Sequence, residues 1–401
     1  MQIKPILAAL RRHRIAAFLI GMEIALACAI LCNALFLIAH RVEAMQVDSG
    51  VDQDRLVLVT LSGVDDTHAA DLVARLRTGF AGIAGVQSVA VANAAPFTQQ
   101  AGESGFRIDA NDPKYHNEGH FYVAGPAFAG TLGLRLAAGR WFKPDEYGPM
   151  GDFVPRSPSI MLDAAYAARL WPGQDPLGKM VYAIDHEYRV IGTYKSLMRP
   201  NPNPYATYNT FVLAGQPGPH LASVYVLRTT PPQTGRVWRD ARALVASVAP
   251  GVVVDPDQSG PMLALRHTYF ASDRAMAGML VGVIVALLGV TALGIVGLAS
   301  FWVAQRRKQI GVRRALGATR GDILRYFQTE NFLIVTFGIV LGMVLAFGLN
   351  LVLMAHYELP RLPFYYLPAG AVALWLLGQL AVLAPALRAA AVPPVVATRS
   401  V

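Results

Sequence analysis

Four long runs of apolar residues constrain this chain more than any other feature of its sequence. They occupy residues 15–39, 275–304, 332–355 and 367–383. The hydrocarbon core of a bilayer is about 30 Å thick, and about 20 helical residues cross it. A helix satisfies its own backbone hydrogen bonds there, which an irregular segment cannot do. The sequence therefore predicts a membrane protein with four transmembrane helices.

The first apolar run has a rival interpretation as a cleaved signal peptide. It follows a short basic segment, residues 1–14, as the apolar part of a signal peptide does. The run is nevertheless longer than the 7–15 residues typical of a signal peptide, and no convincing small-residue cleavage site follows it. We therefore expect a retained helix.

Basic residues gather in three segments: before the first apolar run, between the second and third runs, and after the fourth run. Residues 1–14, 304–330 and 385–401 carry a combined net charge of +11, whereas residues 42–270 carry −2. An excess of Lys and Arg in short flanking segments marks the cytoplasmic side of a membrane. The distribution predicts cytoplasmic termini in a bacterial inner membrane and indicates no nucleic-acid binding.

Together these patterns predict the organisation of the chain. The long polar region contains alternating and apolar strand patterns at residues 55–61, 86–91, 159–162, 180–184, 188–192, 209–213 and 223–227, with helices at 66–80, 164–171 and 233–248. Such a mixture predicts a large α+β extracytoplasmic domain between the first and second helices. The predicted segments are a cytoplasmic N-terminus (1–14), helix one (15–39), the outer domain (40–270), a stalk with helix two (271–304), a cytoplasmic loop (305–330), helix three (331–355), a short outer loop (356–366), helix four (367–387) and a cytoplasmic tail (388–401).

Two local patterns imitate ligand sites. Residues 173–180 have the spacing of a P-loop, but Met180 stands where Ser or Thr must hold Mg²⁺. His116 and His120 are four apart, yet Gly119 argues against the helix that such a zinc site needs. We expect a structural turn and a solvated loop, with no bound metal or cofactor. No catalytic constellation is recognisable, so we do not expect an enzyme.

Polar and small residues inside the apolar runs are candidates for packing or function. Glu23 lies about 12 Å into the first run at 1.5 Å per residue, and an intramembrane carboxylate is a functional candidate by default. Its alternative role is hydrogen bonding or helix pairing near the inner leaflet. The GxxxG pairs allow helices to approach closely, either between subunits or within the chain. They are Gly278 with Gly282, and Gly338 with Gly342.

The most distinctive pattern lies between the second and third runs. Residues 309–330 read QIGVRRALGATRGDILRYFQTE and follow three basic residues. Apolar residues recur there with helical spacing. The residues alone leave two interpretations open, a basic amphipathic helix resting on anionic lipid and a docking helix for a cytosolic partner.

This segment resembles the hallmark loop of the MacB/FtsX-type (type VII) ABC transporter permeases. The family shows a basic pair, Glu-Ile-Gly, two basic residues, Ala-Leu-Gly-Ala and Asp-Ile. Those places are held here by Arg306-Arg307, Gln309-Ile310-Gly311, Arg313-Arg314, Ala315-Leu316-Gly317-Ala318 and Asp322-Ile323. Gln309 departs from the family, because an amide keeps hydrogen bonding but removes the charge. Residues 125–146 and 159–192 are similar to the MacB periplasmic domain, and residues 385–399 resemble the family's terminal signature.

The resemblance implies a permease subunit that transmits ATP-driven motion of a separate P-loop ATPase to its periplasmic domain. ATP and Mg²⁺ would bind to that ATPase. The work would export or extract a peptide, an antibiotic or a lipid-linked substrate. A second permease subunit, identical or related, is also implied, and a periplasmic adaptor and membrane lipid are further partners. The alternatives are an FtsX-like regulator of cell-envelope enzymes, which transports nothing, and a membrane-bound ligand sensor.

The same resemblance assigns ATPase coupling to particular residues. In this hypothesis Arg313, Arg314 and Asp322 set charge complementarity. The side chains of Ile310, Leu316 and Ile323 would fill a groove of the partner. The complete predicted set is Gln309, Ile310, Gly311, Arg313, Arg314, Ala315, Leu316, Gly317, Ala318, Asp322 and Ile323.

Overall fold

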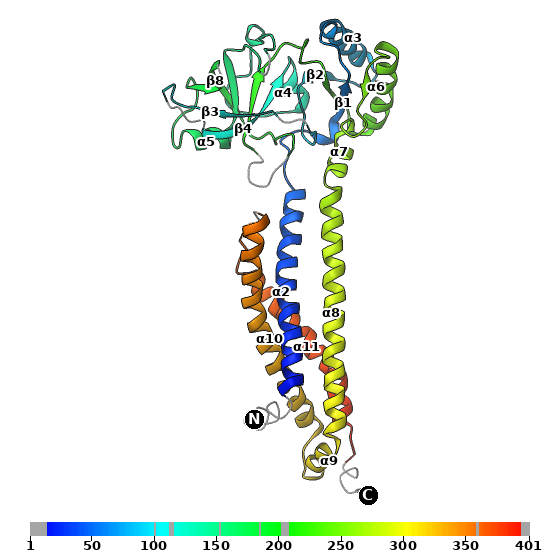
Figure 1. Ribbon diagram of the computed structural model, residues 1–401. Helices are drawn as coiled ribbons and strands as arrows, with labels where there is room; N and C mark the ends of the chain where they lie inside the picture. Colours follow the sequence, from blue (N-terminus) through cyan, green and yellow to red (C-terminus); the bar gives the residue numbers. More distant parts are fainter. Residues whose placement is uncertain are drawn as a thin grey trace. The chain divides into compact units, whose positions relative to one another are not determined.

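The computed structural model describes residues 14–99, 102–111, 116–151, 154–183, 186–201, 208–357 and 361–393 (Figure 1). The chain divides into two compact units. One, called here the outer domain, is Gln46–Ala271. The other, called the membrane unit, contains the described residues of Met1–Met45 and Ser272–Val401.

The membrane unit is helical. Its helices are α2 (Arg14–Met45), α8 (Ala271–Gln305), α9 (Arg307–Ala315), α10 (Arg320–Tyr357) and α11 (Tyr366–Ala390). All but α9 are long and apolar enough to cross a membrane. The prediction of four transmembrane helices is therefore confirmed. Helix α10 begins at Arg320, inside the segment predicted as a cytoplasmic loop. The helix that contains the third span therefore starts before its apolar part.

Helices α2 and α10 pack closely because glycines remove side chains from their contact. A Cβ at Gly338 would lie 2.8 Å from the carbonyl oxygen of Gly21, and one at Gly342 would lie 2.5 Å from Cys28 Cβ. This GxxxG pair therefore packs within the chain. A Cβ at Gly278 or Gly282 would meet no atom within 4 Å in the described part of the chain, so the pair on α8 lies open.

One sheet organises the outer domain. Its strands are β1 (Leu56–Ser62), β2 (Ser88–Ala92), β3 (Gly102–Phe106), β4 (His116–Ala124), β5 (Leu136–Gly139), β6 (Ser159–Asp163), β7 (Met180–Ala183), β8 (His186–Tyr194), β9 (Thr210–Ala214), β10 (Val224–Arg228), β11 (Val253–Val254) and β12 (Gly260–Pro261). The order is β11-β1-β10-β2-β4-β9-β6-β8-β5, with β12, β3 and β7 paired to β1, β4 and β8. The pairs β4–β9 and β6–β8 are parallel, and the other named pairs are antiparallel.

Helices cover this sheet and complete the predicted α+β fold. They are α3 (Ala69–Gly82), α4 (Phe128–Leu132), α5 (Ala164–Leu170), α6 (Thr234–Val248) and α7 (Met262–Tyr269), with short 3₁₀ turns at η1 (Gln53–Arg55), η2 (Pro144–Glu146) and η3 (Pro231–Gln233). Figure 1 shows α3 and α6 side by side next to β1. Phe80 of α3 packs edge-on to Tyr225 of β10, with 5.3 Å between ring centroids. Apolar burial of this kind is the main stabilising contribution to such a core.

The prediction of a solvated loop at residues 116–120 is wrong. These residues begin β4, which pairs with β3 on one side and β9 on the other. His120 is buried, and its backbone N–H donates to the carbonyl oxygen of Asn209 at 2.7 Å. Burial lowers the pKa of His120. The local sequence HNEGH is polar and contains glycine, so its strand structure comes from pairing with β3, and at His120 also with β9, rather than from propensity.

Candidate functional site

The predicted coupling residues form two helices joined by a tight turn. Helix α9 ends at Ala315, and α10 begins at Arg320. Gly317 adopts a φ of +97°, a left-handed conformation that glycine reaches without a Cβ penalty. The N–H of Ala318 donates to the carbonyl oxygen of Arg313 at 3.0 Å, closing the end of α9. The Ala-Leu-Gly-Ala sequence therefore makes a helix-terminating turn.

Asp322 caps the helix that follows this turn. Its carboxylate accepts the backbone N–H of Thr319 at 2.9 Å and the Thr319 hydroxyl at 2.6 Å. In return, the N–H of Asp322 donates to the Thr319 hydroxyl oxygen at 3.2 Å. This reciprocal pattern is a capping box, which satisfies backbone donors that the first turn of a helix leaves unpaired. The position of Asp322 thus has a local structural cause.

The apolar face of the turn is used within the chain. Ile310 and Ile323 are only 5% and 3% exposed, and with Phe327 they pack against Ala386 and Ala389 of α11. Gly311 is buried as well. This corrects the expectation that Ile310 and Ile323 fill a partner's groove, because both side chains already fill the chain's own core.

A different apolar pair faces outward. Leu316 is 83% exposed, and Val312, four residues earlier on the same face of α9, is 44% exposed. The other predicted coupling residues that are exposed are Gln309, Arg313, Ala315, Gly317 and Asp322. The turn therefore presents an apolar tip surrounded by polar and basic groups.

The two arginines of the motif are positioned differently. The Arg313 guanidinium lies over the Tyr326 ring, 4.9 Å from its centroid, while the residue remains exposed. Arg314 is partly buried and donates from Nη1 to the carbonyl oxygen of Ala390 at the end of α11. A cation is favourable there because carbonyl oxygens at a helix C-terminus carry partial negative charge. Arg314 therefore links the coupling turn to α11.

Sequence reasoning missed a buried ion pair at this end of the membrane unit. Arg306, between α8 and α9, donates from Nη1 to both carboxylate oxygens of Glu330 on α10, at 3.0 and 2.8 Å. Their side chains are 11% and 1% exposed. The guanidinium also lies 5.5 Å from the Trp302 ring centroid. The sequence did contain one signal for this ion pair: Glu330 borders the third apolar run, and the basic pair Arg306-Arg307 borders the second.

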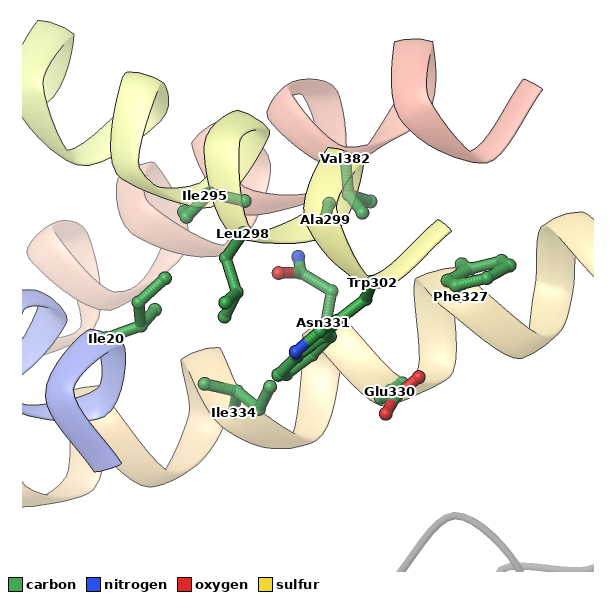
Figure 2. A pocket seen from close by; sticks show the side chains of 10 residues that line it. All are labelled: Ile20, Ile295, Leu298, Ala299, Trp302, Phe327, Glu330, Asn331, Ile334 and Val382. Atoms are coloured by element: carbon green, nitrogen blue, oxygen red, sulfur yellow. The ribbon is translucent and has the colours of Figure 1, made fainter. Parts of the chain in front are cut away.

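Glu330 also borders a small cavity between the helices. Glu330, Asn331 and Ile334 of α10 line it together with Leu298 and Trp302 of α8 (Figure 2). The cavity is about 20 Å³, which is room for about one water molecule. Asn331 donates to the carbonyl oxygen of Gly378 on α11 at 2.9 Å. This hydrogen bond joins α10 to α11 at the level of the cavity.

Glu23 lies against a glycine of α8. A Cβ at Gly294 would come within 2.8 Å of Glu23 Oε2, so only the absence of a side chain at residue 294 leaves space for the carboxylate. The carboxylate is half-buried between α2 and α8. This contact is the arrangement expected of a helix-pairing residue, which was one of its two predicted roles.

Comparison with known families decides the identity of the chain. The MacB-like periplasmic core domain family matches residues 16–256, and the FtsX-like permease C-terminal family matches residues 281–394. The chain belongs to the MacB/FtsX-type ABC transporter permeases. The second match includes the turn and the Arg306–Glu330 pair. Membership confirms the resemblance inferred from the hallmark loop, and it implies a membrane-spanning permease of the bacterial inner membrane with a periplasmic domain.

Individual relatives of this permease are similar over part of their length. A macrolide export ATP-binding/permease protein MacB of Agrobacterium fabrum is 26% identical over 234 residues, covering 56% of this chain and 34% of the relative. The MacB protein of Neisseria gonorrhoeae is 24% identical over 268 residues, covering 65% and 39%. The permease therefore spans little more than a third of the length of these curated relatives.

Two solved structures are similar to the outer domain. The periplasmic region of MacB from Actinobacillus actinomycetemcomitans is 13% identical, with a TM-score of 0.37, covering 56% of this chain and 97% of that chain. The extracellular domain of the noncanonic ABC-type transporter YknZ from Gram-positive bacteria is 16% identical, with a TM-score of 0.34, covering 50% and 98%.

Proposed function

We propose that this permease couples to a separate P-loop ATPase through the turn between α9 and α10. The exposed tip formed by Leu316 and Val312 is the observation that carries the proposal. A leucine 83% exposed at a helix end loses favourable burial unless another surface covers it. Exposed apolar groups rimmed by polar residues are typical of protein interaction sites. ATP and Mg²⁺ would be bound by the ATPase, and this chain would hold neither.

The lipid-surface interpretation is weaker in this arrangement. An interfacial helix needs a broad apolar face that it can bury in the membrane. The apolar face of α9 includes Ile310, which is already packed inside the chain together with Ile323. What remains is a small tip at the end of the helix, with Arg313 beside it. Such a tip fits a groove of a protein partner better than a flat lipid surface.

Three connections support transmission of movement away from the turn. The cluster around Ile310 and the Arg314–Ala390 hydrogen bond tie it to α11, and the Arg306–Glu330 pair ties the start of α9 to α10. Helix α8 ends at Gln305, the residue that directly precedes Arg306. Displacement of the turn would therefore move α8, which follows α7 of the outer domain directly in the chain. This mechanotransmission would drive the periplasmic domain without any channel for substrate through this subunit.

The work would export or extract a substrate outside the inner membrane. The substrate class proposed is a peptide, an antibiotic or a lipid-linked molecule; the name of the curated relatives specifies macrolide export for those proteins. Both termini would be cytoplasmic, in agreement with the basic surplus of residues 1–14 and 385–401. A second permease subunit and a periplasmic adaptor would complete the complex.

The test is ATP hydrolysis by the complex, purified from its native membrane and reconstituted in lipid nanodiscs. Leu316→Asp, and separately Arg313→Glu combined with Arg314→Glu, are expected to abolish the stimulation of hydrolysis by the permease. Leu263→Asp on α7, also an exposed leucine, is the matched control and should change nothing. Unchanged stimulation in both test variants would overturn the coupling role. Coupled hydrolysis without any exported substrate would favour the FtsX-like regulator.

A further inference from the structure

An apolar cavity of about 320 Å³ opens in the outer domain beside α4. Ala124 of β4 and Val212 of β9 contribute to its lining from the sheet, and Phe128 contributes from α4. Trp141, Phe142 and Tyr147 line it from the segment that follows β5. The described residues that line the cavity include no charged side chain. Small residues on one part of the wall and aromatic rings on another leave a space of defined shape.

The aromatic wall is held by one buried carboxylate. Glu146 accepts hydrogen bonds from Arg140 Nη1 and Nη2 at 2.6 and 2.8 Å, and from the Lys143 backbone N–H at 2.7 Å. The Ser159 hydroxyl on β6 adds a fourth donor at 2.7 Å. These bonds fix residues 140–147 in place, so the rings of Phe142 and Tyr147, 6.0 Å apart and edge to face, cannot readily collapse into the space.

A residue with strained backbone also lines the cavity. Ala127 has a φ of +67°, a left-handed conformation that is uncommon for a residue with a Cβ. An alanine Cβ is crowded by the backbone in this region, so the conformation is disfavoured relative to right-handed backbone. The turn at Ala127 starts α4 and directs Phe128 toward Tyr122, with 6.0 Å between ring centroids. Strain of this kind gathers at ligand-binding sites, where the surroundings maintain it.

We infer that this cavity binds a neutral small molecule through an aromatic or alicyclic group of about two rings. Neutrality follows because the described lining residues carry no charge, and the Arg140–Glu146 pair that holds the aromatic wall is neutral as a pair. The size follows because an apolar cavity of about 150 Å³ holds benzene. The surrounding rings suit offset or edge-to-face contact with such a group. The site goes beyond the proposed function, since it lies wholly in the outer domain and needs no ATPase.

The experiment uses the full-length protein in nanodiscs and the apolar photoprobe TID, an iodophenyl trifluoromethyl diazirine. After irradiation and digestion, mass spectrometry locates the labelled peptides. We expect labelling of a peptide containing residues 141–147 in addition to the membrane helices. Excess naphthol should remove the label from that peptide and leave the label on the membrane helices. Labelling of residues 124–147 that is absent, or that naphthol does not reduce, would overturn the inference.

A matched pair of variants assigns the label to this cavity. Ala129→Trp adds bulk at the cavity wall and should cause loss of the naphthol-sensitive label. Ala246→Trp adds the same bulk on α6, away from the cavity, and should retain it. Unchanged labelling of the membrane helices shows that each variant is inserted and folded there. Persistence of the label in Ala129→Trp would show that the probe binds elsewhere and would overturn the assignment.

Discussion

Arg306 donates to both carboxylate oxygens of Glu330, and this bidentate contact joins the segment between α8 and α9 to α10. The Glu330 side chain is almost fully buried, so the Arg306 guanidinium takes the place of water around its carboxylate. Burying two ions is costly even when they are paired, whereas removing one of them leaves an uncompensated charge. The pair thus fixes the start of α9, and with it the turn between α9 and α10, to the side of α10.

Removing either charge should destabilise the membrane unit. Glu330→Ala or Arg306→Ala is expected to lower the free energy of unfolding by about 3–5 kcal/mol, the range for breaking a buried pair. The double variant Arg306→Leu with Glu330→Leu should recover most of that loss. Thermal unfolding in detergent measures both. Arg307→Ala, at an exposed neighbouring position, is the control, and equal loss in this control would contradict the prediction.

Substitution of glycine by alanine should lower the stability of the protein at one GxxxG pair and raise it at the other. Gly342→Ala places a Cβ 2.5 Å from Cys28 Cβ and 2.6 Å from the Ala25 carbonyl oxygen, so α2 and α10 must separate. Overpacking of this kind typically costs about 1–3 kcal/mol. Gly282→Ala meets no neighbour in the described residues and gains helix propensity, up to about 1 kcal/mol. Thermal unfolding of the two variants should therefore shift in opposite directions.

Sequence patterns predicted the membrane spans, which depend on continuous apolar runs, and most of the long strands, which depend on short apolar or alternating patterns. They failed at β3 and β4, where GESGF and HNEGH lack such a pattern. These segments become strands by pairing with each other, and β4 pairs also with the distant β9. The hallmark loop identified the family and the segment proposed to couple to the ATPase, but not the direction of the side chains in that segment. Whether Ile310 faces inward depends on Ala386 and Ala389 of α11, which lie far away in the sequence. The Arg306–Glu330 pair likewise requires the packing of α8 against α10.

Acid should weaken the attachment of residues 140–147. The Arg140 guanidinium, with the Lys143 N–H and Ser159 hydroxyl, lowers the pKa of Glu146 from 4.5 to about 2. A lowered carboxyl pKa adds stability above pH 4.5, and that stability is lost as the pH falls from 4.5 toward 2. The wild type should therefore exceed Glu146→Gln in melting temperature at neutral pH, and the difference should shrink over this window. A difference independent of pH would contradict the role of the charge.

Loss of the capping box should loosen the start of α10 alone. Asp322→Ala leaves the backbone N–H of Thr319 without its carboxylate acceptor, which weakens the first turn of α10. Hydrogen exchange of the amides at residues 319–324 should accelerate, while exchange further along α10 should not change. Asp322→Asn, which keeps an acceptor oxygen, should retain most of the protection. Faster exchange along the whole helix would instead indicate a role in packing.

Ile310 and Leu316 should separate stability from coupling, because one is buried and the other exposed on the same short segment. Ile310→Ala opens a space beside Ile323 and Phe327 and is expected to cost about 2–5 kcal/mol of unfolding free energy. Leu316→Ala removes a side chain with few contacts and should change stability by no more than about 0.5 kcal/mol. Its effect should appear only in stimulated ATP hydrolysis, which is expected to fall. If Leu316→Ala instead lowers the melting temperature as much as Ile310→Ala, the tip is part of the permease core and its proposed role at the ATPase is wrong.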